Sequence, residues 1–335
     1  MTVPALKTRK PTGETPWPIL CIAGAEKTGK SWSCAVASSS DLIDRTLWVG
    51  IGEDDPDEYG RIPGARFEIV EHDGTYRGIL GQLQAAAALP VGDRPNLLVI
   101  DSGTRLWELL CDMAQREANQ REARKRARAN KPPSDEDVQI TMDLWNVAKD
   151  RWQNVLDVLR EHQGPSIITA RLDEVTVLDG SGRPTQQKTL KVKAEKGLPY
   201  DVGATVQMPE RGKAYLVGVR TTRMEVPDRM PLPGFTVDKL WRDLGLAAEP
   251  AGERRHSGAN AQTDQAWLAS WNRRLDTAGE DDLPVLWDEL VQVRREGDLG
   301  EDDALACRQA YEAKATDVKR AAALAAQDRI AGGAA

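Results

Sequence analysis

The sequence predicts an α/β fold with a mainly parallel core sheet, extended by antiparallel strands and followed by a small C-terminal helical module. Three observations lead to this fold class. Short apolar stretches alternate with helical patterns as far as Arg171, which is typical of a parallel sheet covered by helices. Short strands of alternating polarity follow, two of them on either side of an Asp179-Gly180 turn. Three amphipathic helical patterns then occupy the chain from about residue 265.

Composition limits the classes of protein to which the chain can belong. Its 335 residues are 40% hydrophobic and 29% charged, as in ordinary globular proteins. The net charge of -7 excludes a protein that coats nucleic acid with its whole surface, so any such contact must be a local basic patch. Four cysteines without a CxxC pair argue against a structural zinc site. No signal peptide is visible and no apolar run approaches the roughly 20 residues of a membrane span, so we expect a cytoplasmic protein without a membrane partner.

Polarity and proline content divide the chain into four segments. Residues 1–18 are polar and interrupted by prolines, which predicts a flexible lead-in. The predicted α/β domain covers 19–246. A polar linker over 247–264 then precedes the helical module over 265–328.

Local patterns place the elements of the first domain. Buried strands are expected at 19–23, 46–51, 66–72, 96–101 and 166–170. Helices are expected from Lys30 to about Asp44, from Tyr76 onwards, and from a start signal that pairs Ser134 with Asp137. The last helix presents an apolar face formed by Trp145, Ala148, Trp152, Val155, Leu156 and Leu159.

Beyond Arg171 the predicted strands are short. The sequences TLKVKA, GATVQM and AYLVGV alternate in polarity and predict an antiparallel extension of the sheet. The helical module is predicted from three groups of apolar residues at helical spacing: Trp267, Leu268, Trp271 and Leu275; Leu283, Leu286, Leu290 and Val293; and Leu305, Tyr311, Ala315 and Val318.

The segment GAEKTGKS lies between the first strand and the first helix and matches the pattern GxxxxGK[ST]. Glycines at Gly24 and Gly29 permit the dihedrals by which successive N–H groups point at phosphate oxygens, and the helix adds its positive end. Lys30 is expected to reach the β- and γ-phosphates, and Ser31 to ligate Mg²⁺. The alternative is a glycine turn beside a surface lysine. We expect nucleotide contacts from the loop and the residue after it: Gly24, Ala25, Glu26, Lys27, Thr28, Gly29, Lys30, Ser31 and Trp32.

Two acids at the ends of later strands complete the predicted site for ATP and Mg²⁺. Asp101 ends the buried run LLVID and is expected to hold the metal together with Ser31. Glu53 follows the second strand and is expected to orient the attacking water, with Lys30 as the other catalytic residue. Because parallel strands end at one edge of a sheet, both acids should face the glycine-rich loop. The alternatives are a turn aspartate and a solvated acidic cluster.

Thr169 and Arg171 end the next core strand, so they should lie at the same edge. We consider both as candidate sensors of the γ-phosphate. A polar residue that merely terminates a strand is the alternative for each.

With these motifs in order, the sequence resembles the RecA-like P-loop ATPases and, more narrowly, phage-encoded RecA-like ATPases associated with single-strand annealing recombination. The resemblance covers about residues 17–230 and is carried by GAEKTGKS, GEDDPDEYG, LLVIDSGTRLW, IITARLDE and AYLVGVRTTRM. It implies that Glu53, after the second strand, is catalytic. It also implies that the polar residue after the later strand couples nucleotide to DNA. The family has a glutamine there, where this chain offers Thr169 or Arg171.

The resemblance further implies a homo-oligomer with ATP between subunits, located in the bacterial host cell if the protein is encoded by a phage. Basic residues on a late strand of the family reach the nucleotide of a neighbouring subunit. Arg220 and Arg223 match this feature loosely and are candidates for a role in trans.

Two basic segments are candidate contacts for single-stranded DNA. Residues 116–131 hold seven Arg and Lys against two Glu, and the predicted hairpin carries further cations. Rows of Arg and Lys neutralise phosphates and bind without regard to sequence. A solvated face is the alternative for each segment. The candidate residues are Arg124, Lys125, Arg126, Arg128, Lys131, Arg183, Lys188, Lys191 and Lys193.

These features favour a DNA-dependent ATPase that acts in recombination, annealing or replication. One alternative is a nucleotide-gated DNA scaffold with little turnover that recruits a partner through its helical tail. A ring helicase of the same fold is a second alternative, because assembly geometry is not written in motifs. A small-molecule kinase is a poorer fit, since the basic segments and the tail have no evident use there.

Overall fold

The computed structural model describes residues 8–134, 136–247, 251–255, 268, 271–279, 282–296, 299 and 301–332. The chain forms two compact units, Met1–His256 and Ser257–Ala335, each of which is described by itself. The strands of the first unit are β1 (Ile19–Gly24), β2 (Thr46–Gly50), β3 (Glu68–Ile69), β4 (Leu97–Asp101), β5 (Ser166–Leu178), β6 (Pro184–Lys193), β7 (Ala204–Glu210), β8 (Lys213–Val219) and β9 (Met230–Pro231). Its helices are α1 (Lys30–Ala37), the 3₁₀-helix η1 (Pro56–Arg61), α2 (Tyr76–Ala87), α3 (Gly103–Arg128), α4 (Met142–Glu161), α5 (Leu198–Asp201) and α6 (Val237–Asp243).

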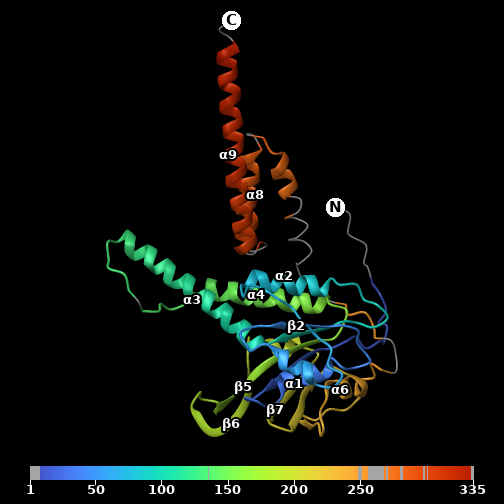
Figure 1. Ribbon diagram of the computed structural model, residues 1–335. Coiled ribbons are helices and arrows are strands. Elements are labelled where there is room, and N and C mark those ends of the chain that lie inside the picture. Colours follow the sequence, from blue (N-terminus) through green and yellow to red (C-terminus); the bar gives the residue numbers. More distant parts are fainter. Residues whose placement is uncertain are drawn as a thin grey trace. The chain divides into compact units, whose positions relative to one another are not determined.

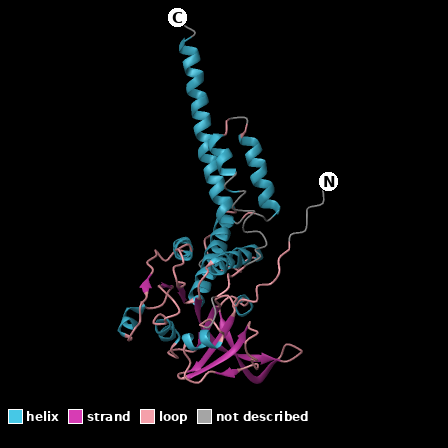
Figure 2. Ribbon diagram, turned by 90° about the vertical axis from the view of Figure 1, so that its right-hand side faces the viewer, coloured by secondary structure: helices cyan, strands magenta, loops and turns pink. Residues whose placement is uncertain are grey.

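The strands of the first unit form one sheet in the order β3-β2-β4-β5-β1-β7-β8-β9, with β6 paired to the outer part of β5. Figure 2 shows these strands gathered in the lower part of the view. Pairing is parallel from β3 through β7, and antiparallel for β5–β6, β7–β8 and β8–β9. The predicted mixed α/β architecture, with a mainly parallel core and an antiparallel extension, is therefore confirmed.

Helices cover both faces of the sheet, which is why its central strands are continuous apolar runs. Along β1, Ile19 and Cys21 pack in one core with helices α2, α3 and α4, whereas Leu20 and Ile22 pack in a second core with α1 and α6. Figure 1 shows α2 and α4 on one side of the sheet and α1 and α6 on the other. The predicted apolar face of α4 lies in the first core, with Trp145 half-buried at its margin.

Helix α1 ends at Ala37, so the predicted extension to about Asp44 is wrong. The residues that follow are serines, whose hydroxyls donate to nearby carbonyls and compete with the helix ladder. Ser38 Oγ donates to Ala35 O at 2.6 Å. The guanidinium of Arg66, 28 residues further along the chain, donates to Ser38 O and Ser40 O at 3.1 and 2.6 Å. This distant arginine stabilises a turn where the local pattern indicated helix.

Two further boundaries differ from the prediction. The strand expected at 66–72 is reduced to Glu68–Ile69, because only these residues pair with β2 at the edge of the sheet. The helix start expected at Ser134 lies instead at Met142, with Thr141 as the preceding residue. Asp137 does not cap a helix; its carboxylate accepts from Asn119 Nδ2 at 2.8 Å and holds the returning chain against α3.

Two arms extend past the ends of the core strands. The strand β5 pairs with β1 only as far as Arg171 and then continues, with β6, as a two-stranded ribbon that turns at Asp179–Arg183. Helix α3 begins directly after β4 and is 26 residues long, and its far end projects away from the sheet (Figure 1). We call the edge where β1, β2 and β4 end the carboxyl edge.

The second unit is helical in its described parts. It contains α8 (Leu283–Glu296), α9 (Glu301–Gly332) and a helical segment at 271–277. Trp271, Leu275 and the first three predicted residues of α8 are buried in its core. Leu305 is an exception, because it is 50% exposed while the neighbouring Ala304 and Cys307 are buried. The predicted Trp267 lies outside the described residues.

No helix within the described part of the chain is long and apolar enough to cross a membrane.

Candidate functional site

The loop at 24–31 is held open at its base by two glycines that nothing larger can replace without strain. A Cβ on Gly24 would lie 2.5 Å from Thr28 Oγ1 and 2.9 Å from Met208 O. Gly29 has φ of 103°, a left-handed conformation that favours glycine, and it directly precedes α1. Thr28 Oγ1 donates to Ala25 O at 3.0 Å, which fixes the turn between the two. The loop therefore has the backbone form that presents N–H groups to an anion at a helix start.

Lys30 folds over this loop. Its Nζ donates to Gly24 O at 3.1 Å and to Ala25 O at 2.9 Å. Burial lowers the pKa of Lys30, and the nearby carboxylates of Asp101 and Glu53 partly oppose that change. A half-buried ammonium held by two carbonyls is a donor that an incoming phosphate can recruit, since charge-assisted hydrogen bonds are the stronger ones.

Asp101 lies opposite the loop at the end of β4 and is 6% exposed. Thr169 lies within neighbouring β5, which continues to Leu178 rather than ending at 170 as predicted, and its Oγ1 donates to Asp101 Oδ1. Burial raises the pKa of Asp101, while hydrogen bonds from Thr169 and Ser31 act in the opposite direction. The predicted pair Ser31 and Asp101 is thus brought together, and Thr169 contacts the acid. Carboxylate and hydroxyl oxygens are ligands that suit Mg²⁺, so the donor set fits this metal.

Glu53 is placed three residues after β2, and its Oε1 atom accepts two hydrogen bonds and lies near a further cation. Ser102 Oγ donates to it at 3.0 Å and Arg171 Nη2 at 2.8 Å, while Arg105 Nε lies 3.9 Å away. The Glu53 side chain is 31% exposed. Glu53 therefore belongs to a polar network at the carboxyl edge.

Arg105 extends this network away from the loop. Its Nη1 donates to Glu108 Oε2 at 3.0 Å, one turn along α3. Lys193 Nζ, at the end of β6, lies 3.1 Å from Glu108 Oε1. Thr104 Oγ1 donates to Lys193 O and accepts from Arg171 N, so hairpin, helix and core strand meet here. We call the series Arg171, Glu53, Arg105, Glu108 and Lys193 the ion-pair chain.

The sequence reasoning missed Ser102, Arg105 and Glu108 as members of the site. Ser102 directly follows Asp101, and the other two lie three and six residues after it on one side of α3. The spacing of three residues along a helix was the available signal. It could not be used without knowing that the start of α3 lies beside β5 and β6.

Arg220 and Arg223 lie at the other end of the sheet. Arg220 follows β8, and its N–H donates to Gly203 O, just before β7 begins. A Cβ on Gly245 would lie 3.1 Å from the Arg223 guanidinium, so that side chain packs near the end of α6. Neither arginine is near the glycine-rich loop of its own chain. A role in trans therefore requires subunits arranged head to tail, with one sheet end against the carboxyl edge of the next.

The basic segment at 116–131 is helical through Arg128 rather than a loop. Part of its charge is paired within the helix: Arg126 Nε lies 3.1 Å from Glu122, and Arg124 Nη1 lies 4.0 Å from Glu117. The described part of the chain offers Lys125, Arg128 and Lys131 no side-chain ion pair. These three cations sit at the far end of α3.

The hairpin lysines divide between its two faces. Lys191 and Lys193 share one face with Arg171, because residues two apart along a strand point the same way. Lys188 lies on the other face, where its Nζ contacts Glu174 at 2.7 Å. Arg183 lies in the exposed turn. Only the face with Lys191 and Lys193 continues toward the glycine-rich loop.

Trp32 directly follows Ser31 and is 53% exposed. Its ring meets Tyr59 of η1 edge to face, with centroids 6.3 Å apart. Trp32, which is among the predicted nucleotide contacts, therefore places an exposed aromatic ring beside the loop. Glu26 and Lys27 are exposed at the tip of the loop and pair with each other at 3.1 Å.

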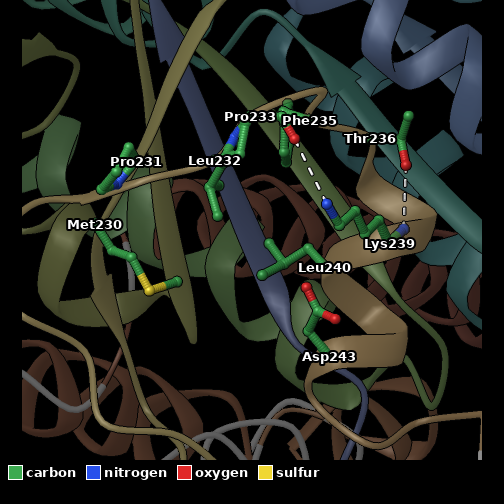
Figure 3. Close-up of a pocket in the computed structure, with 9 residues that line it drawn as sticks. All are labelled: Met230, Pro231, Leu232, Pro233, Phe235, Thr236, Lys239, Leu240 and Asp243. Carbon is green, nitrogen blue, oxygen red and sulfur yellow. Dashed lines mark hydrogen bonds between the residues drawn. The ribbon is translucent and has the colours of Figure 1, made fainter.

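A separate pocket lies between β9 and α6, away from the loop (Figure 3). It encloses about 170 Å³ and is lined mainly by apolar side chains such as Met230, Leu232 and Leu240. Lys239 and Asp243 add charge to its lining. None of the predicted site residues lines it.

Comparison with known proteins gives weak matches. No family model matches the chain. ATP-citrate synthase from Bos taurus is 25% identical over 114 residues, which is 34% of this chain and 10% of that protein. The chain thus spans about a tenth of the length of this curated relative. The crystal structure of the RadB recombinase matches at a TM-score of 0.37 and 14% identity, over 64% of this chain and 86% of that one.

Proposed function

We propose that the chain is a RecA-like ATPase that binds and hydrolyses ATP and acts on single-stranded DNA in recombination, annealing or replication. The phage-type single-strand annealing role suggested by the sequence motifs is part of this proposal. The observation that carries it is the convergence of Lys30, Ser31, Asp101 and Glu53 at the carboxyl edge, around a glycine-constrained loop that opens a helix.

Each residue has a distinct part in the proposed reaction. Main-chain N–H groups of the loop hold the phosphates, and Lys30 moves from its two carbonyls to the β- and γ-phosphates. Ser31 and Asp101 would hold Mg²⁺, which would supply positive charge against the phosphates. Glu53 orients the attacking water. Thr169 connects Asp101 to β5, and Arg171 connects Glu53 to the same strand, which makes both suitable sensors of the γ-phosphate.

The proposal includes a DNA-binding surface on the two arms that project from the carboxyl edge. Arg and Lys side chains on these arms would neutralise phosphates in a salt-sensitive, sequence-independent manner. Five of these cations have no ion pair in the described chain, namely Lys125, Arg128, Lys131, Arg183 and Lys191. A homo-oligomer with ATP between subunits, and a partner for the helical module, complete the proposed function.

A nucleotide-gated scaffold with little turnover is a second candidate. It is favoured by the engagement of Glu53 Oε1 by Ser102 and Arg171, because a carboxylate held this way must change partners before it orients water. Both candidates require ATP at the same loop, and they differ in turnover.

The test is ATP turnover by the full chain, titrated with single-stranded DNA, for the parent and for Lys30→Ala. We expect the parent to hydrolyse ATP and to be stimulated by DNA. Lys30→Ala should lose at least about 100-fold in turnover, as expected when a group that stabilises transition-state charge is removed. A folded parent that binds a non-hydrolysable ATP analogue without turnover would favour the scaffold, and a parent that binds none would overturn both.

A further inference from the structure

The ion-pair chain connects the carboxylate assigned to water with the base of the hairpin. Every neighbouring pair along it is a contact between opposite charges: Arg171 with Glu53 at 2.8 Å, Glu53 with Arg105 at 3.9 Å, Arg105 with Glu108 at 3.0 Å, and Glu108 with Lys193 at 3.1 Å. Its side chains are between 31% and 43% exposed, so they are accessible to rearrangement. The chain runs from β5 through α3 to β6.

Arg105 is the member whose bonds are incomplete. Its Nη1 is bonded to Glu108, but within the described part of the chain its buried Nε has no hydrogen-bond partner. Glu53 Oε1 lies 3.9 Å from that Nε, whereas Glu108 Oε2 lies 3.0 Å from Arg105 Nη1. Arg105 therefore lies between two carboxylates. A small movement of its guanidinium decides which of them it pairs with more closely.

Glu108 is shared in turn between Arg105 and Lys193. Burial alone would raise the pKa of Glu108, but the hydrogen bonds from Lys193 and Arg105 outweigh burial and the pKa lies below its ordinary value. Two cations that share one carboxylate repel each other. Removing Lys193 from Glu108 therefore increases the attraction between Glu108 and Arg105.

We propose that Glu108 and Arg105 are positioning residues through which a polyanion bound at Lys193 controls Glu53. This inference rests on the proposed function, since it assigns a regulatory route to the same site. A phosphate backbone that recruits Lys193 leaves Glu108 with one cation. Arg105 then moves toward Glu108 and away from Glu53, so that Glu53 loses one neighbouring cation and its carboxylate becomes a better acceptor for the attacking water.

The experiment uses the full chain with Glu108→Gln. In this variant the charge that would draw Arg105 away is missing, so bound DNA no longer reaches Glu53. We expect the ratio of DNA-stimulated to DNA-free ATP turnover to fall about fivefold or more, as for coupling between sites. Binding of a fluorescein-labelled oligodeoxythymidylate is measured by anisotropy. Its dissociation constant should change less than about twofold, because replacing Glu108 by glutamine adds no contact to phosphate. Glu108→Asp, which keeps the charge, should restore part of the stimulation.

Glu174→Gln is the matched control. It removes the same charge from an ion pair on the same hairpin, with Lys188 at 2.7 Å, but on the face that has no link to Glu53. Stimulation should persist in this variant. Normal stimulation in Glu108→Gln, or equal loss in both variants, would overturn the relay. A parent without ATP turnover would instead refute the proposed function, so the two failures are distinguishable.

Discussion

The two ends of the central sheet use arginine in opposite ways. At the carboxyl edge, Arg171 and Arg105 share the Oε1 of Glu53, and one donor of Arg105 remains without a partner in the described chain. At the other end, Arg254 donates to carbonyls of four residues, with 3.2 Å from Nε to Trp17 O, 2.6 Å to His162 O and 2.9 Å to Gly164 O. The fourth is Leu159 O.

This difference separates a cation that can change partners from one that cannot. Main-chain carbonyls are fixed by the backbone, whereas a carboxylate side chain can rotate. Burial lowers the pKa of Arg254 to about 10, so it remains protonated at neutral pH and holds the segment 251–255 against the end of α4. The carboxyl edge is built to rearrange, and the opposite end is built to persist. Substitutions at the first should change rates, and substitutions at the second should change stability.

The largest expected effect is that of Glu53→Gln on turnover. Glutamine keeps the size and can still accept from Ser102, but it cannot act as a general base. We expect kcat for ATP to fall about 100-fold or more, with little change in the thermal midpoint. Asp54→Asn is the control, because Asp54 is an exposed neighbour in the same acidic loop. Equal losses in the two variants would show that the loop, rather than Glu53, matters.

The next effect is that of Arg254→Met on stability. The substitution leaves the carbonyls at the end of α4 without their donor, and hydrogen bonds to charged groups contribute about 2 kcal/mol. We expect the free energy of unfolding of the first unit to drop by about that amount in urea, while kcat at low temperature is retained. Arg255→Met removes an exposed neighbour that pairs with Glu253, and it should change stability by less than about 0.5 kcal/mol. A stable Arg254→Met variant with reduced kcat would contradict the comparison between the two ends.

The parts of the carboxyl edge that depend on local sequence pattern could be predicted from the sequence. The glycine-rich loop, its strand and its helix are adjacent in the chain, so GAEKTGKS identifies them together. Glu53 and Asp101 are both found at the carboxyl edge because strands in a parallel sheet end on one side. These inferences needed only the order of the elements.

The partners of Glu53 and Arg254 depend on contacts that are distant in the chain. Arg171 is 118 residues from Glu53, and Arg254 is 237 residues from Trp17. The partners that Lys188 and Lys193 meet depend on the register of β6 against β5. The end of α1 was misplaced for the same reason, because Arg66 determines it from another segment. Periodicity carries no information about such pairs.

A smaller effect concerns the cost of keeping Asp101 ionised at the carboxyl edge. Burial raises the pKa of Asp101 above its ordinary value of 3.8, so the folded protein binds this proton more tightly than the unfolded chain does. Stability contributed by the protonated acid is present below pH 3.8 and is lost as the pH rises through the higher folded pKa. Asp101→Asn cannot ionise. We expect its thermal midpoint relative to the parent to be higher at pH 7 than at pH 4, while ATP turnover is lost. A relative midpoint that is equal at both values would contradict this.

The smallest expected effects separate the two faces of the hairpin. Lys191 has no ion pair in the described chain and shares the face of Lys193, whereas Lys188 is paired with Glu174 on the other face. Each phosphate contact contributes about one to the slope of log K against log salt. We expect Lys191→Ala to lower this slope for single-stranded DNA by about one and to weaken binding by a few-fold, and Lys188→Ala to leave the slope unchanged. Equal slopes for all three proteins would mean that neither face meets phosphate, and the carboxyl edge would then act on nucleotide without the hairpin. A lower slope for Lys188→Ala alone would place the DNA on the face away from Glu53, where the ion-pair chain could not sense it.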